Sequence, residues 1–183
     1  MVRQALKNAV LAPALILFLT FLPFLTEAAE DRIPFRGLKE VGVFVEDIDP
    51  EAIKDGLSKE QIKTDVESKL REAGIKVIPT ENCLHLPASP SGTDSYLYVI
   101  VNTVKFVSGL EYVYGTSVQL KQVVALERGK TVKPSRALLW ATTWEKSDGV
   151  EISWVKDLAE NVRRHISDKV DLFIGDYSAA NPK

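Results

Sequence analysis

Apolar residues recur along this chain with two different periods, and the change of period marks out the elements. Between residues 38 and 48, three valines share one face while Phe44 lies on the other, which is typical of a central strand. Between 58 and 74 the apolar residues recur at steps of three and four, as on the buried stripe of a helix. Residues 75–78, Ile-Lys-Val-Ile, are then predicted as a second strand. The pattern therefore predicts a β-α-β unit whose two strands are parallel and joined by a right-handed crossover.

The predicted helix carries start and stop signals. Ser58 is placed to accept a hydrogen bond from the backbone N–H of Gln61, whose side chain is expected to reach back. Leu57 is placed to pack on Ile62, so the segment indicates a capping box with its hydrophobic staple. Gly74 supplies the left-handed residue at which the helix is expected to end.

Two strands are predicted in the middle of the chain. Residues 96–106 carry apolar side chains at both alternating sets of positions, which predicts a strand buried on both sides. Residues 112–127 have a mostly polar second face, which predicts partial exposure. Gly115 lies inside this second strand and indicates a bulge.

A third strand is expected at 137–145, after a loop that contains Gly129 and Pro134. Strict alternation would place four of its side chains on one face: Leu138, Trp140, Thr142 and Trp144. The three strands are connected by short loops, so we expect an antiparallel meander.

The last element is a long helix over 153–177, where apolar residues again recur at steps of three and four. The resulting order is β-α-β-β-β-β-α. It predicts an α+β fold, a two-layer sandwich in which both helices lie on one face of a mixed, mostly antiparallel sheet. The other face of the sheet would then be open.

The first residues indicate export. Arg3 and Lys7 precede an unbroken apolar run at 9–25, and small residues lead to a cleavage position after Ala28. We therefore interpret the start of the chain as a signal peptide, with an uncleaved membrane anchor as the alternative. The expected location of the mature protein is the periplasm or the extracellular space.

The domain division follows from this interpretation. Residues 1–28 form the signal peptide, residues 29–37 a flexible leader, and residues 38–183 one α+β domain. The chain has 23 basic and 25 acidic residues, a net charge of −2, so it lacks the large positive field of a nucleic-acid binder. Its one cysteine forms no internal disulfide, and the fold has to be stabilised by its apolar core.

Reactive side chains come together in the sequence at two places. Cys83 and His85 lie in a polar, proline-bearing loop at 79–93, and a thiol beside an imidazole suits a nucleophile pair or a metal site. Asp47 and Asp49 are acidic residues at alternate positions, as in a site for a hard cation. Neither place has the further ligands or spacing that a known motif requires. We assign no catalytic residue, cofactor or metal, and keep a small-molecule or metal-dependent, possibly hydrolytic, site at this loop as the alternative.

The aromatic residues on the predicted strands suggest a binding surface. Trp140, Trp144, Tyr96 and Tyr98 would supply an apolar patch if the open sheet face carried them. The sequence thus favours a non-enzymatic protein-interaction domain whose partner is another envelope or extracellular protein. Membrane contact is expected only through the first segment, if that segment is not cleaved.

Through residues 42–47, 57–62, 70–77 and 176–183 the chain resembles a family of short exported bacterial proteins of unknown function. The resemblance implies export and no particular activity. The order of elements is similar, at the level of fold, to envelope α/β domains of the Tol translocation protein's N-terminal region and of the curli-export and penicillin-binding-protein-activator lipoproteins. That similarity implies binding to other envelope proteins, although this chain lacks the lipoproteins' anchoring cysteine.

Overall fold

The computed structural model of the chain describes residues 33–79, 95–128 and 135–182. The elements in chain order are the 3-10 turn η1 (Ile33–Phe35), β1 (Glu40–Val45), α2 (Pro50–Lys54), α3 (Lys59–Glu72), β2 (Lys76–Val77), β3 (Ser95–Lys105), β4 (Glu111–Arg128), β5 (Ser135–Ser147), β6 (Glu151–Trp154), the 3-10 turn η3 (Val155–Asp157) and α4 (Leu158–Ala180).

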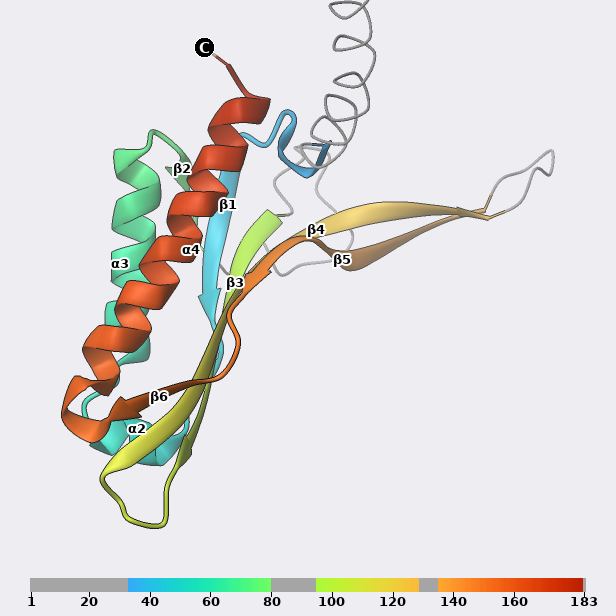
Figure 1. Cartoon of the computed structure of the whole chain (residues 1–183). Coiled ribbons are helices and arrows are strands. Elements are labelled where there is room, and N and C mark those ends of the chain that lie inside the picture. Colours follow the sequence, from blue (N-terminus) through green and yellow to red (C-terminus); the bar gives the residue numbers. More distant parts are fainter. Residues whose placement is uncertain (1–32, 80–94, 129–134, 183) are drawn as a thin grey trace, which may run out of the picture.

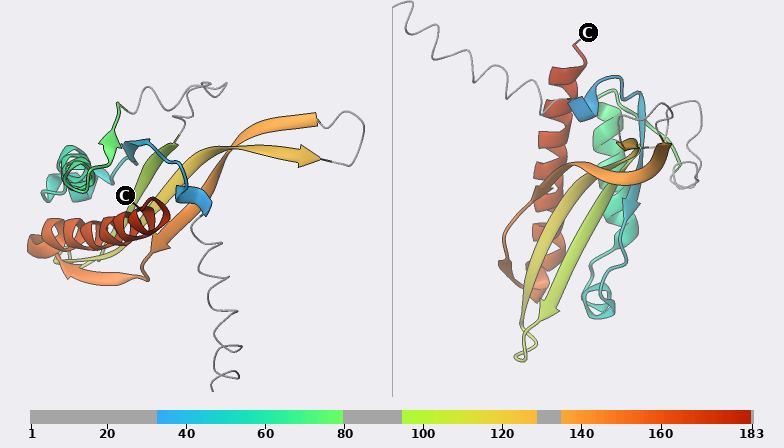
Figure 2. Two further views of the ribbon diagram at one scale, coloured as in Figure 1. Left: turned by 90° about the horizontal axis from the view of Figure 1, so that it is seen from above. Right: turned by 90° about the vertical axis from the view of Figure 1, so that its right-hand side faces the viewer.

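These strands form one mixed sheet in the order β2-β1-β3-β4-β5, and β6 pairs with the end of β4 that β5 does not reach. β1 is parallel to both β2 and β3, whereas the β3-β4-β5 meander is antiparallel. The two long helices, α3 and α4, lie side by side on one face of the sheet (Figures 1 and 2). The predicted two-layer α+β sandwich is therefore confirmed, and so is the parallel β1-α3-β2 unit.

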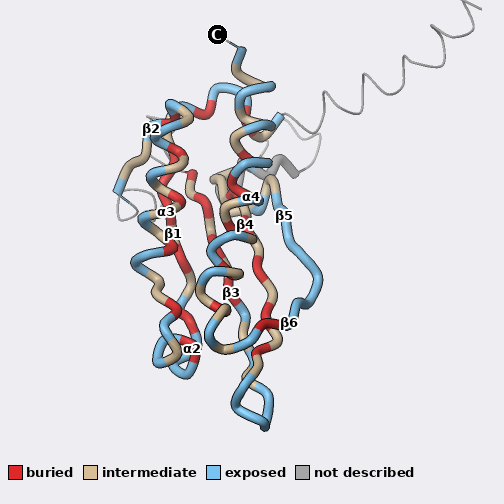
Figure 3. Tube along the Cα trace, turned by 60° about the vertical axis from the view of Figure 1, so that its left-hand side comes forward, coloured by how far each residue is buried: buried red, intermediate tan, exposed pale blue. Residues whose placement is uncertain are grey.

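Burial alternates along the strands because successive side chains point to opposite faces. In β3, Leu97 and Val99 are fully buried toward the helices, while Tyr96 and Tyr98 on the other face are only half-buried. The expectation that this strand is buried on both sides is wrong, because the two long helices cover one face alone. Figure 3 shows the buried residues gathered between helices and sheet.

The start of α3 has half of the predicted capping box. The Ser58 hydroxyl accepts a hydrogen bond from the Gln61 N–H at 3.2 Å, as expected. The Gln61 side chain, however, donates forward along the helix to Asp65 at 2.8 Å, and the Ser58 hydroxyl donates to Glu60 at 3.1 Å. The stop signal is confirmed, because Gly74 has a φ of 81°.

The last helix begins later than its apolar period predicts. Residues 151–154 form β6 instead, in antiparallel register with β4 from Glu111 opposite Trp154 to Tyr114 opposite Glu151. β5 has left β4 by this point, so the backbone groups of β4 find their partners in β6. The buried stripe of α4 is as predicted: Leu158, Val162, Ile166, Val170 and Phe173.

The pairing of β4 with β5 contains one irregularity. Leu120 lies opposite Trp144, but the next residue, Lys121, lies opposite Thr142, so Thr143 is the extra residue of a bulge. The bulge that we expected at Gly115 is absent from the β3–β4 register, where Gly115 lies opposite Asn102 without a shift. Glycine instead marks the point at which β5 separates from β4.

Candidate interaction surface on the open sheet face

The sheet face away from the helices carries an aromatic cluster made by three strands. Phe44 on β1 stacks on Tyr98 of β3 with ring centroids 5.4 Å apart, and Tyr96 meets Trp140 of β5 at 5.1 Å. Tyr96 and Tyr98 contact each other edge to face at 6.3 Å. Alternation along each strand puts these four rings on one face, and each is half-buried by its neighbours. We call Phe44, Tyr96, Tyr98 and Trp140 the aromatic cluster.

Two ammonium groups lie over this cluster. The Lys59 Nζ is 5.4 Å from the ring centroid of Phe44, and the Lys121 Nζ is 5.5 Å from that of Tyr98. Both distances allow a cation–π attraction. Lys59 also forms an ion pair with Asp47 at 2.6 Å, whereas the Lys121 ammonium donates to the Thr142 hydroxyl at 2.5 Å. The patch is apolar at its centre and charged at its margin.

Burial, followed by a hydrogen bond to Glu46, raises the pKa of the Tyr98 phenol above its ordinary value. The phenol therefore stays protonated at neutral pH, and its O–H is engaged with the carboxylate. The aromatic cluster therefore offers an uncharged, largely apolar surface to a binding partner.

Further along the same face is an apolar triplet that crosses three strands. Val104 on β3 lies opposite Val113 on β4, which in turn lies opposite Ile152 on β6. Val104 is 68% exposed and Ile152 is 65% exposed. The sequence did not reveal this triplet, because residue 152 preceded what the period predicted as helix and only the pairing of β6 brings it beside β4.

A hollow of about 380 Å³ lies between the cluster and the triplet. Its floor includes Gly115, where the absence of a side chain leaves space, and a Cβ there would meet the Gly149 carbonyl oxygen at 3.8 Å. Its wall is the β5–β6 corner at 147–150. This volume accommodates one or two apolar side chains of a partner.

The β5–β6 corner that forms this wall is held in place by a lysine on α4. Lys169 on α4 is 3% exposed, and its ammonium donates to the Asp148 carboxylate, to the Thr116 hydroxyl at 2.8 Å and to the His165 carbonyl at 3.2 Å. Such a buried ammonium is stable only with its partners in place. The interaction ties the corner to the helical layer and keeps the wall in one position.

Of the four residues predicted to form a binding surface, the structure brings three together. Tyr96, Tyr98 and Trp140 are members of the aromatic cluster, but Trp144 lies on the covered face. There it packs against Phe35 and Phe173 at 6.0 and 5.4 Å, and its indole N–H donates to Asp176 at 2.9 Å. The predicted common face for both tryptophans is wrong because the bulge at Thr143 reverses the alternation between them.

The candidate metal ligands are used in other ways where the structure describes them. Asp47 pairs with Lys59, and Asp49 caps the short helix α2 by accepting the Glu51 N–H at 2.8 Å. Cys83 and His85 lie outside the described residues. Within the described ranges, no three histidine, cysteine or acidic side chains are grouped as ligands for a metal ion.

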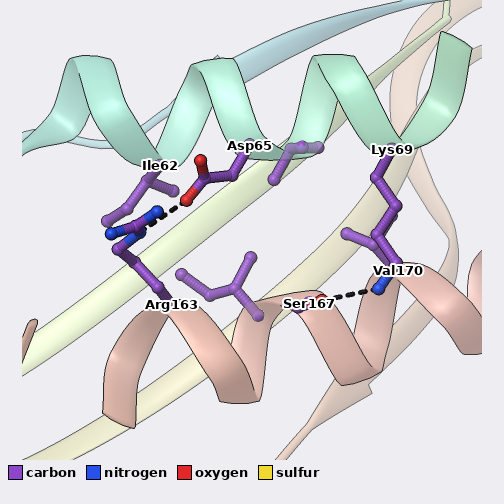
Figure 4. Close-up of a pocket in the computed structure, with 8 residues that line it drawn as sticks. Ile62, Asp65, Lys69, Arg163, Ser167 and Val170 are labelled. Carbon is purple, nitrogen blue, oxygen red and sulfur yellow. Dashed lines mark hydrogen bonds and ion pairs between the residues drawn. The ribbon is translucent and has the colours of Figure 1, made fainter. Parts of the chain in front are cut away.

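A small cavity of about 30 Å³ lies between α3 and α4 (Figure 4). It is bridged at one end by Arg163 and Asp65, with Nε to Oδ2 at 2.5 Å, and at the other by Lys69 and Ser167, with Nζ to Oγ at 2.5 Å. The volume holds about one or two water molecules. We interpret it as part of the contact between the helices and not as a ligand site.

No family model, curated protein or solved structure matches this chain. Among the helices within the described ranges, none is both long and apolar enough to cross a membrane. The interpretation of this surface therefore rests on its geometry and chemistry.

Proposed function

We propose that this protein is a non-enzymatic protein-interaction domain that binds another protein through its open sheet face. The observation that carries the proposal is the aromatic cluster of Phe44, Tyr96, Tyr98 and Trp140 on the face that neither long helix covers. Tyrosine and tryptophan are enriched at protein interfaces because they bury a large apolar area at a small cost in side-chain entropy.

The surroundings of the cluster support a protein as the ligand. The contact area continues through the hollow to Val104 and Ile152, so it is elongated along the strands. An apolar centre with a polar margin is the usual arrangement of a protein–protein interface. A partner segment that places an apolar side chain in the hollow and a carboxylate near Lys121 would match these features.

The proposed place of action is the periplasm or the extracellular space. This part of the proposal rests on the pattern of residues 1–28 alone, in which basic residues precede an apolar run and a small-residue cleavage position. The partner is accordingly expected to be an envelope or extracellular protein.

Site-specific photo-cross-linking in cells that produce the full chain tests the proposal. A benzophenone amino acid replaces Tyr98 in the cluster in one chain and Leu172 in another, since Leu172 is 53% exposed on α4, on the opposite layer. We expect a discrete adduct with a second protein from position 98 and none of the same mass from position 172. Introducing Trp140→Ala into the position-98 chain should remove most of the adduct.

Two results would contradict the proposal. One is the same adduct from positions 98 and 172, which would indicate that the contact does not depend on the open sheet face. The other is an adduct at position 98 that Trp140→Ala leaves unchanged. An adduct of two copies of this chain would assign the face to self-association instead of to another protein.

A further inference from the structure

A second apolar surface lies at the end of the molecule away from the aromatic cluster. The β3–β4 turn carries Phe106, Val107 and Leu110, and β6 brings Trp154 beside it. Val107 is fully exposed, and the exposed fractions of Leu110, Trp154 and Phe106 are 63%, 53% and 42%. We call these four residues the apolar tip. The turn projects beyond the helices and the rest of the sheet (Figures 1 and 2).

None of the four tip residues carries a charge, while the acidic Glu111 directly follows Leu110 and lies opposite Trp154 in the β4–β6 register. Residues 106–110 read Phe-Val-Ser-Gly-Leu, and the nearest preceding charge, Lys105, points to the other face, where its ammonium bonds the Asp55 carboxylate at 2.6 Å. The hydroxyl of Ser108 is turned back into the turn and accepts the Leu110 N–H at 3.4 Å. The turn itself therefore offers the solvent a mostly hydrocarbon and aromatic surface, with the partly exposed Glu111 at its base.

The backbone of the tip has partners within the molecule at the base of the turn, at Phe106, Gly109 and Leu110. The Phe106 N–H donates to the Glu111 carbonyl at 2.9 Å, and the Gly109 N–H donates to the Phe106 carbonyl at 2.8 Å. The Leu110 carbonyl accepts the Val155 N–H at 3.0 Å, which joins the turn to the end of β6. Backbone groups need internal partners of this kind wherever a segment leaves water for an apolar medium.

The base of the tip is held rigidly. The Asp55 carboxylate accepts both the Lys105 ammonium at 2.6 Å and the Tyr112 hydroxyl at 2.7 Å, so it fixes both strands of the hairpin to the segment after α2. Four large apolar side chains are thus presented on a firm, convex projection. The side chains are exposed because an ordered hairpin holds them away from the core.

We propose that the apolar tip inserts into the interfacial region of a lipid bilayer, with Trp154 at the level of the head groups. A projecting tip suits a lipid surface because lipids rearrange around it, whereas a protein partner would need a cavity of matching shape. Tryptophan favours the membrane interface, where its ring is apolar and its N–H is hydrated. Because the four tip residues are uncharged and the neighbouring Glu111 is acidic, binding should not require anionic lipid. The tip adjoins Val104 and Ile152 of the proposed interaction surface and shares no residue with it. The test below measures lipid contact at Trp154, so its result does not depend on a protein bound at the aromatic cluster.

The test measures the position of Trp154 in the full chain with vesicles of phosphatidylcholine brominated on its acyl chains. The apolar run at residues 9–25 can itself bind vesicles, so binding alone is not informative. Trp140→Phe and Trp144→Phe leave Trp154 as the one tryptophan. We expect its emission to shift to shorter wavelength and to be quenched. Adding Val107→Ser and Leu110→Ser should lower the quenching by about threefold or more, because the two apolar side chains that would enter the lipid are replaced by polar ones.

The matched control is the chain in which Trp144 is the one tryptophan, since Trp144 lies under α4 and cannot reach lipid while the domain is folded. Quenching confined to Trp154, present on phosphatidylcholine alone and not increased when phosphatidylglycerol is added, is the expected result. Unquenched Trp154 on vesicle-bound chain would overturn the proposal, as would equal quenching of Trp144 and Trp154. Shielding of Trp154 from acrylamide without lipid, increasing with protein concentration, would assign the tip to a second copy of the chain.

Discussion

Trp140 and Trp144, four residues apart on β5, lie on opposite faces of the sheet. A regular strand would place them on the same face, but the extra residue at Thr143 reverses the alternation. Trp140 consequently joins Tyr96 on the open face, and Trp144 joins Phe173 under α4. One bulge thus gives one tryptophan to the candidate surface and the other to the core.

This division predicts unequal losses of stability. Trp144→Ala removes a ring packed on Phe35 and Phe173 together with a hydrogen bond to Asp176, and should lower the free energy of unfolding by about 2–4 kcal/mol. Trp140→Ala loses mainly its contact with Tyr96 and should cost about 1 kcal/mol. Urea unfolding of both variants checks the order, and equal losses would contradict the placement.

The buried Lys169 predicts an asymmetry between two substitutions of one ion pair. The Lys169 side chain is 4% exposed and the Asp148 side chain is 41% exposed. Asp148→Ala strands an ammonium away from water and should cost about 2–4 kcal/mol, whereas Lys169→Met leaves a carboxylate that water can reach and should cost about 1 kcal/mol. Thermal or urea unfolding distinguishes these values, and the reverse order would show that Lys169 is hydrated.

Asp55 predicts a loss of stability in acid. Hydrogen bonds from Lys105, and next from Tyr112, hold the pKa of its carboxyl below 3.8 in the folded state. An unfolded-state pKa of about 3.9 is higher, so this contribution is complete above that pH and is lost as the pH falls through the folded value. Unfolding measured from pH 7 to 3 should show that Asp55→Asn is less stable at neutral pH and loses less stability below about pH 4. If the stability of the parent chain and of Asp55→Asn changed in parallel with pH, the assignment of this acid sensitivity to Asp55 would be contradicted.

The start of α3 offers a paired test of the partial capping box. Ser58→Ala removes the acceptor for the Gln61 N–H and should lower the free energy of unfolding by about 1 kcal/mol. Gln61→Ala should cost less than about 0.5 kcal/mol, because this side chain contacts Asp65 on the helix surface and does not cap the helix. A larger loss from Gln61→Ala would indicate a complete capping box in solution.

Local patterns in the sequence predict the main elements correctly because their causes lie within a few residues. The alternation around Phe44, the Ser58 cap and the left-handed Gly74 each depend on neighbours along the chain. The long apolar stripe of α4 likewise depends on a period that one helix sets by itself. These features were sufficient to predict two helices on one face of a mixed sheet.

The errors occur where partners distant in sequence decide the outcome. The apolar period places residues 153 and 154 in the last helix, but β4 needs backbone partners there and pairs residues 151–154 as a strand. The position of the bulge depends on how β5 fits β4, and Thr143 shows no local sign of it. The burial of Lys169 depends on Asp148, which the β5–β6 corner brings above it.

The sequence by itself determined the kinds and the order of the elements, because helical and extended periods are local properties of the chain. Only the tertiary structure decided which aromatic residues share a face and which apolar residues remain uncovered. The aromatic cluster takes its rings from β1, β3 and β5, and the apolar tip joins the β3–β4 turn to Trp154. Such surfaces depend on register between strands, which distant backbone pairing sets and no local pattern encodes.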